Sequence, residues 1–462
     1  MNLYLFMKNM SLNNLIITRV ASELDRVALI GKNERVSFSD LIGTYSDMHN
    51  KRVVVFITDT LSLVKTLVSL DGSAQAICPI STATDKKELY HLVSENKFDA
   101  VITDLNKEDL EVFTRFNIQV CNLIDIGLSD KKRIDSSNQN STWLVPTSGT
   151  TSLPKLVSHT LGSLGASSLR LRKISEQNKI WGQFYDFTRY AGYQVLLNSL
   201  LNGHTLVTSS LKDPIHERVK RCAEECVTHI SATPSQWRKI LMTGEGAKRI
   251  PLEQIVLGGE AADQQILRAL SSFYPDTKIT HTYASTEAGL GLSVSDRLAG
   301  FPTRFFDNSE GLSEISVRSG RLFLRTTSSA SNYVDGKRFK DSQGWIDTGD
   351  LVKVEGERFF IIGRESGIIN VGGDKVNPES VRHTLLEHTD VIQANVFGKK
   401  NPITGMLLSA NIQLKANVDQ ELAKASVKVF IKENLQIKDQ PRLLKFVDDI
   451  EVALTGKLGS GK

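Results

Sequence analysis

The sequence predicts an α/β fold: a large N-terminal domain of largely parallel sheets flanked by helices, a small β-rich part, and a small α+β C-terminal domain. Three observations lead to this prediction. Short apolar runs alternate with amphipathic stretches from residue 52 to about 302, a pattern typical of helix-covered parallel sheets. Closely spaced strands and turns follow from about residue 306. A mixture of helices and strands fills the remainder, and 462 residues suffice for two or three domains.

The strands and helices expected in the first part follow one another at short spacing. The expected strands are Val53–Thr58, Ala100–Thr103, Trp143–Val145, His204–Thr208, Thr228–Ala232, Gln254–Leu257 and Lys278–Tyr283. The helices between them include Pro214–Cys226, Ser235–Met242 and Asp263–Tyr274. The alternation of these short elements favours parallel strands joined by helices.

The later part has a different pattern. A hairpin is expected where Leu351–Val354 and Arg358–Ile362 flank a Glu-Gly-Glu turn. We place a domain boundary after Arg364, which gives an N-terminal domain of residues 1–364 and a C-terminal domain of residues 365–462. The elements expected in the C-terminal domain are a helix from Pro378, since proline suits a first helical position, strands Val391–Phe397 and Leu407–Leu414, and a helix over Asp419–Asn434.

Composition and charge argue against several classes of protein. Apolar residues make up 40% of the chain, and 56 basic residues nearly balance 52 acidic ones, for a net charge of +4. No basic block points to nucleic acid, and no apolar run approaches the ~18 residues of a membrane span. Four cysteines are too few for a disulfide framework. The start lacks the features of a signal peptide. We therefore expect a cytoplasmic protein without a nucleic-acid partner.

The strongest chemical signal directly follows the apolar run Trp143–Val145. Hydroxyl residues, a glycine and a lysine come together there at a strand end, where backbone N–H groups and hydroxyls can wrap an oligophosphate. A polar surface turn of similar composition is the alternative. The residues expected to contact phosphate are Thr147, Ser148, Gly149, Thr150, Thr151 and Lys155.

This segment resembles the phosphate loop T-S-G-T-T-G-x-P-K of the ANL superfamily of adenylate-forming enzymes, which includes acyl-CoA synthetases, peptide-synthetase adenylation domains and luciferases. Ser152 stands where the family has its last glycine. Other family motifs follow in the same order and cover most of the chain. The sequence is therefore identified as a member, closest in style to a compact acyl-CoA ligase.

Two of these motifs are implied to bind the adenine and phosphate groups of ATP. The segment Gly258-Gly259-Glu260 resembles the one that lines the adenine site. The segment from Tyr283 to Glu287 resembles Y-G-x-T-E, with Ala284 in place of the glycine. The resemblance implies that Tyr283 packs on adenine, Thr286 binds phosphate and Glu287 holds Mg²⁺.

Two further motifs are implied to bind the ribose. The segment from Gly344 to Asp350 matches G-W-x-x-T-G-D, whose aspartate accepts hydrogen bonds from the ribose hydroxyls. The pair Gly363-Arg364 matches the hinge motif, which places Arg364 near the ribose.

The C-terminal motifs imply a mobile domain with a catalytic lysine. The loop around Gly372 and Gly373 resembles the one that swings over the active site for thioester formation, and the family's hinge position falls on Ser366. The segment Phe446–Ile450 resembles F-V-D-E-L, with Glu451 in place of the usual proline. Without gaps, the catalytic lysine falls on Lys457, and Lys462 is the alternative.

The acyl pocket is expected in the segment Trp181–Gly203, where the position that is often histidine in the family falls on Arg189. We expect Arg189 to bind a polar or anionic group of the acid. Gly192 would leave room for the substrate, and Gly258 would lie beside it. As alternatives, Arg189 forms a structural ion pair with Asp186 or a surface carboxylate, or Asp186 binds a substrate amine.

The resemblance implies ATP-dependent adenylation of a small-molecule carboxylic acid, followed by transfer of the acyl group to a thiol. The cofactors would be ATP and Mg²⁺. The acceptor would be CoA, which the Gly-Gly loop favours, or the phosphopantetheine arm of a possible acyl carrier protein. A non-catalytic nucleotide-binding member of the fold is the alternative of a different class. It is supported by the departures at Ser152, Ala284, Ser366 and Glu451.

Overall fold

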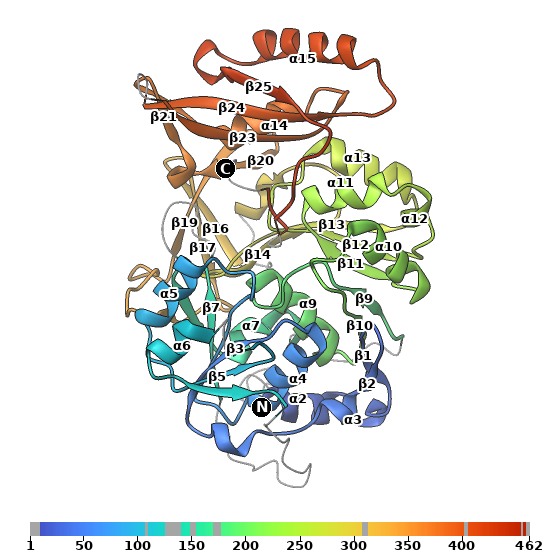
Figure 1. Ribbon diagram of the computed structural model, residues 1–462. Coiled ribbons are helices and arrows are strands. Elements are labelled where there is room, and N and C mark those ends of the chain that lie inside the picture. The colour runs from blue at the N-terminus through green and yellow to red at the C-terminus, as the bar shows by residue number, and fades with distance from the viewer. Residues whose placement is uncertain are drawn as a thin grey trace.

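The computed structural model of the protein describes residues 10–106, 110–124, 140–147, 154–169, 177–306, 313–401, 405–453 and 456–458. Two large sheets and their helices form most of the molecule, and a smaller sheet lies next to them. The C-terminal unit lies across one end (Figure 1). The predicted α/β architecture is confirmed.

The first large sheet has seven strands in the order β18-β8-β7-β4-β3-β5-β6. Its central strand β3 is buried over Val53–Phe56, because parallel neighbours and helices cover both faces. The strands are β3 (Arg52–Phe56), β4 (Ala76–Pro79), β5 (Ala100–Thr103), β6 (Gln119–Asn122), β7 (Thr142–Pro146), β8 (Leu156–His159) and β18 (Asn332–Tyr333). Only β8 and β18, at one edge, pair antiparallel.

The second large sheet has eight strands in the order β14-β13-β12-β11-β9-β10-β1-β2. Pairing is parallel except at the two edges, where β14 and β2 are antiparallel to their neighbours. The strands are β1 (Val27–Ile30), β2 (Arg35–Ser37), β9 (Ile180–Gly182), β10 (Thr205–Val207), β11 (His229–Ala232), β12 (Gln254–Leu257), β13 (Lys278–Ser285) and β14 (Gly289–Val294).

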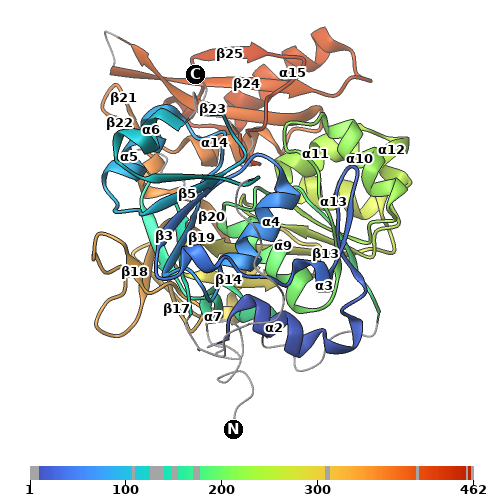
Figure 2. The same cartoon turned by 60° about the horizontal axis from the view of Figure 1, so that its bottom comes forward.

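Helices cover these sheets, and their ends follow from local sequence. Helix α11 begins at Pro234, with the Thr233 side chain accepting from the Gln236 backbone in a capping box. The helices of the large unit are α2 (Leu12–Arg19), α3 (Phe38–Leu41), α4 (Thr60–Leu70), α5 (Lys86–Ser94), α6 (Glu111–Arg115), α7 (Leu161–Leu164), α8 (Ala166–Leu169), α9 (Tyr190–Leu201), α10 (Ile215–Glu224), α11 (Pro234–Met242), α12 (Glu245–Lys248) and α13 (Gln264–Phe273). Figure 2 shows α2, α3 and α4 from below.

A five-stranded sheet in the order β15-β20-β19-β17-β16 forms the β-rich part. The predicted hairpin is confirmed and is longer than expected, because both strands continue toward Asp350 and Arg364. The strands are β15 (Phe301–Pro302), β16 (Ser313–Arg318), β17 (Arg321–Thr326), β19 (Ile346–Glu355) and β20 (Arg358–Arg364).

The C-terminal unit has its own buried core, which includes Val391, Leu408 and Val427. Its elements are β21 (Ile369–Val371), β22 (Asp374–Val376), α14 (Pro378–Leu385), β23 (Val391–Asn401), β24 (Gly405–Leu414), α15 (Gln420–Asn434) and β25 (Leu443–Phe446). The boundary after residue 364 and the mobility of this unit remain predictions. Within the described ranges, no helix is long and apolar enough to cross a membrane.

Candidate functional site

The predicted nucleotide-binding residues come from separate elements that meet beneath the C-terminal unit. They lie at the end of β7, after β12, along β13 and its turn into β14, and on the β19–β20 hairpin. Two of these elements are parallel strands that end at one edge of the second large sheet, where α/β folds bind ligands. Ser148, Gly149, Thr150, Thr151, Ser152 and Lys462 lie outside the described residues.

The two ends of the predicted phosphate loop are held together. The Thr147 backbone N–H donates to the Lys155 carbonyl oxygen at 2.8 Å. The Lys155 backbone N–H in turn donates to Thr147 Oγ1 at 3.2 Å. These bonds continue the antiparallel pairing of β7 with β8, so the loop between them begins and ends at fixed points.

Asp350 lies between Tyr283 and Arg364. Its Oδ2 accepts a short hydrogen bond from the Tyr283 hydroxyl, and its Oδ1 accepts from Arg364 Nε at 3.2 Å. Asp350 is only 5% exposed. Burial and the charge of Asp350 raise the pKa of Tyr283, so the hydroxyl stays protonated and donates. The three residues expected to bind adenine and ribose therefore form one connected group.

The segment after β12 is held against helix α11. Ser235 donates to Glu260 Oε2 through both its hydroxyl, at 2.7 Å, and its backbone N–H, at 3.1 Å. The Tyr185 hydroxyl donates to the Gly258 carbonyl oxygen at 2.9 Å. Gly259 has a φ of +82°, a conformation that glycine adopts without strain. These contacts hold the predicted adenine segment in a defined shape.

Glu287 has contacts that the sequence did not predict. Tyr333, on β18, donates its hydroxyl hydrogen to Glu287 Oε1 at 3.0 Å.

His159 holds the backbone of the neighbouring Thr286. Its Nε2 lies 2.7 Å from the carbonyl oxygen of Thr286, and its Nδ1 lies 2.9 Å from Ser163 Oγ. Burial lowers the pKa of His159 to about 4, so a neutral ring donates to the carbonyl. A polar residue in a buried strand was the available signal for His159, and no local pattern indicated Tyr333.

The C-terminal tail places Lys457 close to the predicted adenine segment. The Thr233 hydroxyl donates a short hydrogen bond to the carbonyl oxygen of Gly456. A Cβ built on Gly259 would lie 3.8 Å from Lys457 Cε. Lys457 is exposed by surface area. Protein atoms that displace part of the water around its ammonium group, and the nearby Arg364, lower the pKa of Lys457, whereas the charges of Glu260 and Asp350 oppose this change. The tail descends from the C-terminal unit toward the large unit (Figure 1).

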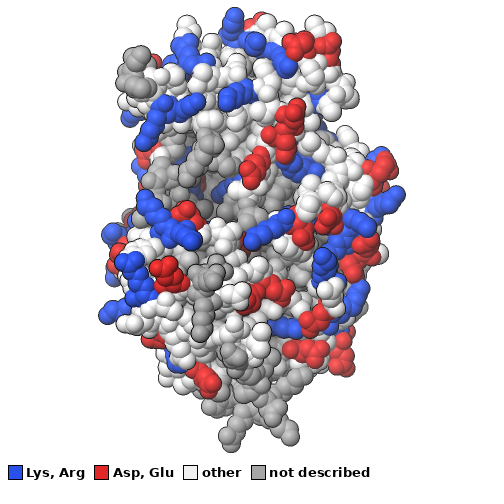
Figure 3. All heavy atoms as spheres, in the orientation of Figure 1, with Lys and Arg blue, Asp and Glu red and all other residues white. Residues whose placement is uncertain are grey.

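Other polar contacts also join the two units. Lys239 on α11 forms an ion pair with Asp449, whose side chain is largely exposed. The Gln265 side chain donates to the His388 carbonyl oxygen at 3.4 Å. On the visible face, positive and negative side chains are intermixed (Figure 3).

The predicted thiol loop lies in the turn between β21 and β22. Gly372 and Gly373 have φ values of +61° and +102° and are exposed, as a tight hairpin turn requires. Asn370 Oδ1 accepts from the Gly373 backbone N–H at 2.8 Å. A Cβ on either glycine would have no heavy atom within 4 Å, so the loop does not touch the cleft in this arrangement of the units.

Arg189 lies just before helix α9, and in the described part of the chain it forms no ion pair with a carboxylate. Its Nη1 lies 3.5 Å from the Pro146 carbonyl oxygen, at the start of the phosphate loop. No described residue lies within hydrogen-bond distance of its buried Nε. The alternative of an ion pair with Asp186 is wrong, because Asp186 Oδ1 instead accepts from the backbone and hydroxyl of Thr188, each at 2.8 Å.

Gly192 has a packing role that differs from the one predicted. A Cβ at this position would lie 2.0 Å from the carbonyl oxygen of Asp186 and 2.8 Å from Phe187 Cα. The room that a side chain would occupy is therefore filled by the protein's own backbone, not left free for a substrate.

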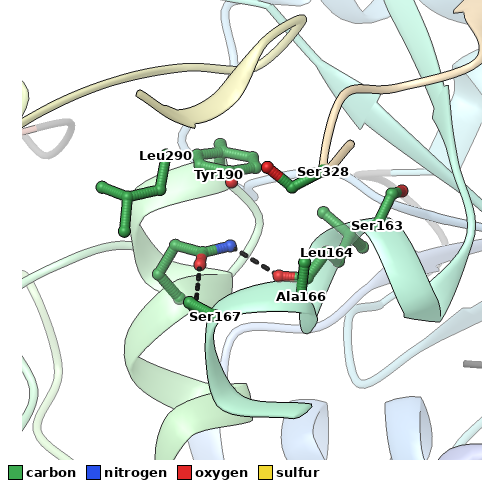
Figure 4. Close-up of a pocket in the computed structure, with 8 residues that line it drawn as sticks. Ser163, Leu164, Ala166, Ser167, Tyr190, Leu290 and Ser328 are labelled. Atoms are coloured by element: carbon green, nitrogen blue, oxygen red, sulfur yellow. Dashed lines mark hydrogen bonds between the residues drawn. The ribbon is translucent and has the colours of Figure 1, made fainter. Parts of the chain in front are cut away.

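A narrow crevice lies beside Tyr190 and is too tight to hold a water molecule. In Figure 4 the Tyr190 ring lies beside Leu290 and Ser328. The Gln194 side chain accepts from the Ser167 hydroxyl at 3.2 Å and donates to the Leu164 carbonyl oxygen at 2.9 Å. A Cβ on Gly289 would lie 3.2 Å from Tyr190 Oη. Tyr190 is 7% exposed and lines this crevice beside Leu290 and Ser328.

The residues present fit an Mg²⁺–nucleotide complex. In the described ranges, no group of three or more His, Cys, Asp or Glu residues could hold a metal alone. Mg²⁺ commonly binds one or two carboxylates together with substrate phosphates. Glu287 could supply that carboxylate. Tyr333 contacts both Glu287 and Lys155, so the end of the phosphate loop at Lys155 lies near Glu287.

The fold is that of a large unit with a small C-terminal unit, and the residues predicted to bind an adenine nucleotide lie near the tail that carries Lys457. The family model for AMP-binding enzymes matches residues 48–308, and the model for the AMP-binding enzyme C-terminal domain matches residues 365–447. The chain therefore belongs to the family of AMP-binding enzymes.

The chain is similar to curated acyl-CoA ligases over most of its length. It is 22% identical to the 2-succinylbenzoate–CoA ligase of Bacillus cytotoxicus, over 96% of each chain. It is 25% identical to 4-hydroxybutyrate–CoA ligase 1 of Metallosphaera sedula, over 68% of this chain and 60% of that protein. The predicted class of AMP-forming acid–thiol ligase is supported by these relatives.

Solved structures share the fold. The anthranilate CoA ligase AuaEII in complex with anthranoyl-AMP has a TM-score of 0.78 at 15% identity, covering 97% of this chain and 95% of that one. The o-succinylbenzoate CoA synthetase of Bacillus subtilis with ATP and magnesium has a TM-score of 0.72 at 20% identity, covering 96% and 98%.

Proposed function

We propose that the protein activates a compact carboxylic acid with ATP, forming an acyl-AMP and pyrophosphate, and then transfers the acyl group to CoA. The observation that carries this proposal is the approach of Lys457, from the C-terminal tail, to Gly259 in the same cleft as Asp350. This arrangement brings a cation to the edge of the nucleotide site.

In the first half-reaction the acid carboxylate attacks the α-phosphorus of ATP, and pyrophosphate leaves. Catalysis of this step consists mainly of positioning and of neutralising negative charge. Lys457 would stabilise the charge that develops as the acyl oxygen attacks. Lys155 would bind the polyphosphate, Glu287 would ligate Mg²⁺, and Asp350 would accept hydrogen bonds from the ribose hydroxyls.

Asp350 keeps acceptor positions that ATP can use. Its two oxygens accept hydrogen bonds from Tyr283 and Arg364. A carboxylate offers about four acceptor positions, so hydrogen bonds from the ribose hydroxyls can be added to these two.

We infer that the acid carries a second polar or anionic group, bound by Arg189. Among the described residues, the buried Nε of Arg189 has no partner, and this supports the inference because an unsatisfied buried donor is costly. The acids named for two relatives point the same way. 2-Succinylbenzoate carries a second carboxylate, and 4-hydroxybutyrate carries a hydroxyl.

In the second half-reaction the C-terminal unit would rotate about the region near Ser366. The tail would leave the cleft and the Gly372–Gly373 turn would approach it, so that a thiol can attack the acyl carbon and AMP can leave. The relatives are named as CoA ligases, which supports CoA as the acceptor. A carrier protein is the second candidate.

ATP–pyrophosphate exchange against a panel of acids tests the proposal, followed by thioester formation with CoA or a phosphopantetheinylated carrier. The panel would contain dicarboxylic, hydroxy, aryl, fatty and amino acids. We expect exchange with one acid class that is lost in Lys457→Ala, and a raised KM for that acid in Arg189→Met. If exchange survives in Lys457→Ala, Lys462 becomes the candidate for the catalytic lysine. No exchange with any acid would favour the non-catalytic alternative.

A further inference from the structure

Tyr333 contacts both of the residues predicted to bind the metal and the polyphosphate. Its hydroxyl donates to Glu287 Oε1 at 3.0 Å. Lys155 Nζ lies 5.4 Å from the centre of its ring, a separation at which a cation is attracted to the aromatic face. One side chain therefore lies between a carboxylate and an ammonium group of opposite charge.

The position of Tyr333 is fixed by the fold. Strand β18 pairs with β8 in the register Tyr333 to Val157, two residues after Lys155. The Tyr333 backbone N–H donates to the Lys337 carbonyl oxygen at 3.2 Å, and Phe339 packs edge-on against its ring at 5.4 Å. On the other side, the Ala330 backbone N–H donates to the Glu287 carbonyl oxygen at 2.9 Å. Backbone hydrogen bonds thus connect the segment 330–333 both to Glu287 and to the strand that begins just after Lys155.

Opposite charges in a cleft tend to form an ion pair. A direct contact between Lys155 and Glu287 would neutralise both groups, and ATP with Mg²⁺ would have to break that contact. Among the described residues, no ion pair involves either side chain. The Tyr333 hydroxyl instead occupies one acceptor position of Glu287, and its ring faces Lys155. Each contact is weaker than the one the ligand would make.

We propose that Tyr333 is a positioning residue that keeps Glu287 and Lys155 apart and oriented for the Mg²⁺–polyphosphate group. The inference rests on the proposed function, because it assumes that these two residues bind Mg²⁺ and phosphate. Tyr333 lies outside every motif from which the site was predicted.

Two substitutions test the two contacts of Tyr333, with Glu287 and with Lys155, one at a time. Tyr333→Phe keeps the ring below Lys155 and removes the hydroxyl. Tyr333→Leu removes both. In the exchange assay we expect Tyr333→Phe to raise the Mg²⁺ concentration for half-maximal rate about 3- to 10-fold, with the KM for the acid unchanged. Tyr333→Leu should also raise the KM for ATP, because Lys155 loses its orientation.

Tyr274→Phe is the matched control. The Tyr274 hydroxyl donates to the Ala247 carbonyl oxygen at 2.7 Å, far from Glu287, so its loss should leave the Mg²⁺ response unchanged. Urea unfolding of all three variants reports any loss of stability separately from the Mg²⁺ effect.

Binding of ATP measured by calorimetry at several Mg²⁺ concentrations separates this inference from the proposed function. If wild type binds Mg²⁺–ATP but exchanges no pyrophosphate, adenylation is wrong, and the Tyr333 inference can still be tested by binding. If Tyr333→Phe has the Mg²⁺ and ATP dependence of wild type in both assays, the inference is overturned. A lower unfolding midpoint with an unchanged Mg²⁺ response would likewise overturn it, because the role would then be structural.

Discussion

The hydroxyl of Thr233 donates a hydrogen bond to the carbonyl oxygen of Gly456, which lies 223 residues further along the chain. Thr233 is fully buried at the start of helix α11. Gly456 directly precedes Lys457, so this bond joins the large unit to the segment that presents the proposed catalytic lysine. A Cβ on Gly456 would lie 2.9 Å from Gln236 Oε1, which explains why a glycine occupies this position.

Thr233→Val keeps the shape of the side chain but removes this hydrogen bond and also the cap of helix α11, so urea unfolding of the variant is measured alongside to report the loss of the cap. A net hydrogen bond contributes about 1 kcal/mol, so we expect about a 5-fold slower adenylation rate, since Lys457 is held in place less often. Transfer from preformed acyl-AMP to the thiol should keep its rate, because the tail leaves the cleft for that step. Single-turnover measurements of each half-reaction check this. Thr243→Val, whose hydroxyl bonds within its own helix end, is the control, and equal slowing of both steps would contradict the prediction.

The ion pair between Lys239 and Asp449 should contribute much less. The Asp449 side chain is 64% exposed, and exposed pairs contribute ~0 to 1 kcal/mol. We expect Asp449→Asn to change the adenylation rate by less than about 3-fold, and the change to disappear in about 1 M salt, where charges are screened within ~3 Å. A large, salt-independent loss would mean that this pair, and not the Thr233 contact, holds the tail.

Tyr190→Ala should widen the range of acids accepted. The residue follows Arg189 and lines a narrow crevice together with Ser163, Ser167 and Gln194. Removal of the ring would open space next to Arg189, the residue proposed to bind the acid. Exchange assays with acids of increasing length should show a longer optimum in this variant and the wild-type optimum in Tyr190→Phe. An unchanged length profile would show that Tyr190 does not limit the substrate.

Gly192→Ala should destabilise the protein, because its Cβ would lie 2.0 Å from the Asp186 carbonyl oxygen. Overpacking of a well-packed site costs about 1–3 kcal/mol and occasionally more. Gly246→Ala is the matched control, since its Cβ would have no neighbour closer than 3.6 Å. Urea unfolding at pH 7 measures both. A stable Gly192→Ala variant with altered acid preference would restore the predicted role in the substrate pocket.

The stability of the protein should fall as pH falls from about 6.5 toward 4. Burial lowers the pKa of His159 to about 4, and an unfolded histidine has a pKa of about 6.5. The unfolded chain therefore binds more protons in this window, and stability that is complete above pH 6.5 is lost below it.

At pH 5 the His159 contribution amounts to at most about 2 kcal/mol. Urea unfolding at pH 7 and pH 5 should show a smaller loss in His159→Gln than in wild type. Asp71, whose pKa burial raises to about 6, has the opposite dependence, and it cancels in this comparison. An equal loss in both proteins would mean that His159 does not titrate in this way.

Local sequence was enough for the elements of the fold and for naming candidate residues of a nucleotide site. Strands such as Gln254–Leu257 are found as predicted because their apolar character and their spacing are local properties. The motif residues carry their chemistry in short segments, so Tyr283, Asp350 and Lys457 could be named before their separation in space was known. In the structure Tyr283 is hydrogen-bonded to Asp350, and Asp350 lies close enough to Lys457 for its charge to affect the pKa of the lysine.

The tertiary structure decided which residues from distant segments touch one another. Tyr333 meets Glu287 only because β18 pairs with β8, and Gly456 meets Thr233 only because the tail folds back on helix α11. It also decided the partner of Asp186 and the packing of Gly192, which the sequence left open or suggested wrongly. The physical reason is that composition and periodicity depend on neighbours along the chain, whereas hydrogen bonds and steric contacts depend on distance in space.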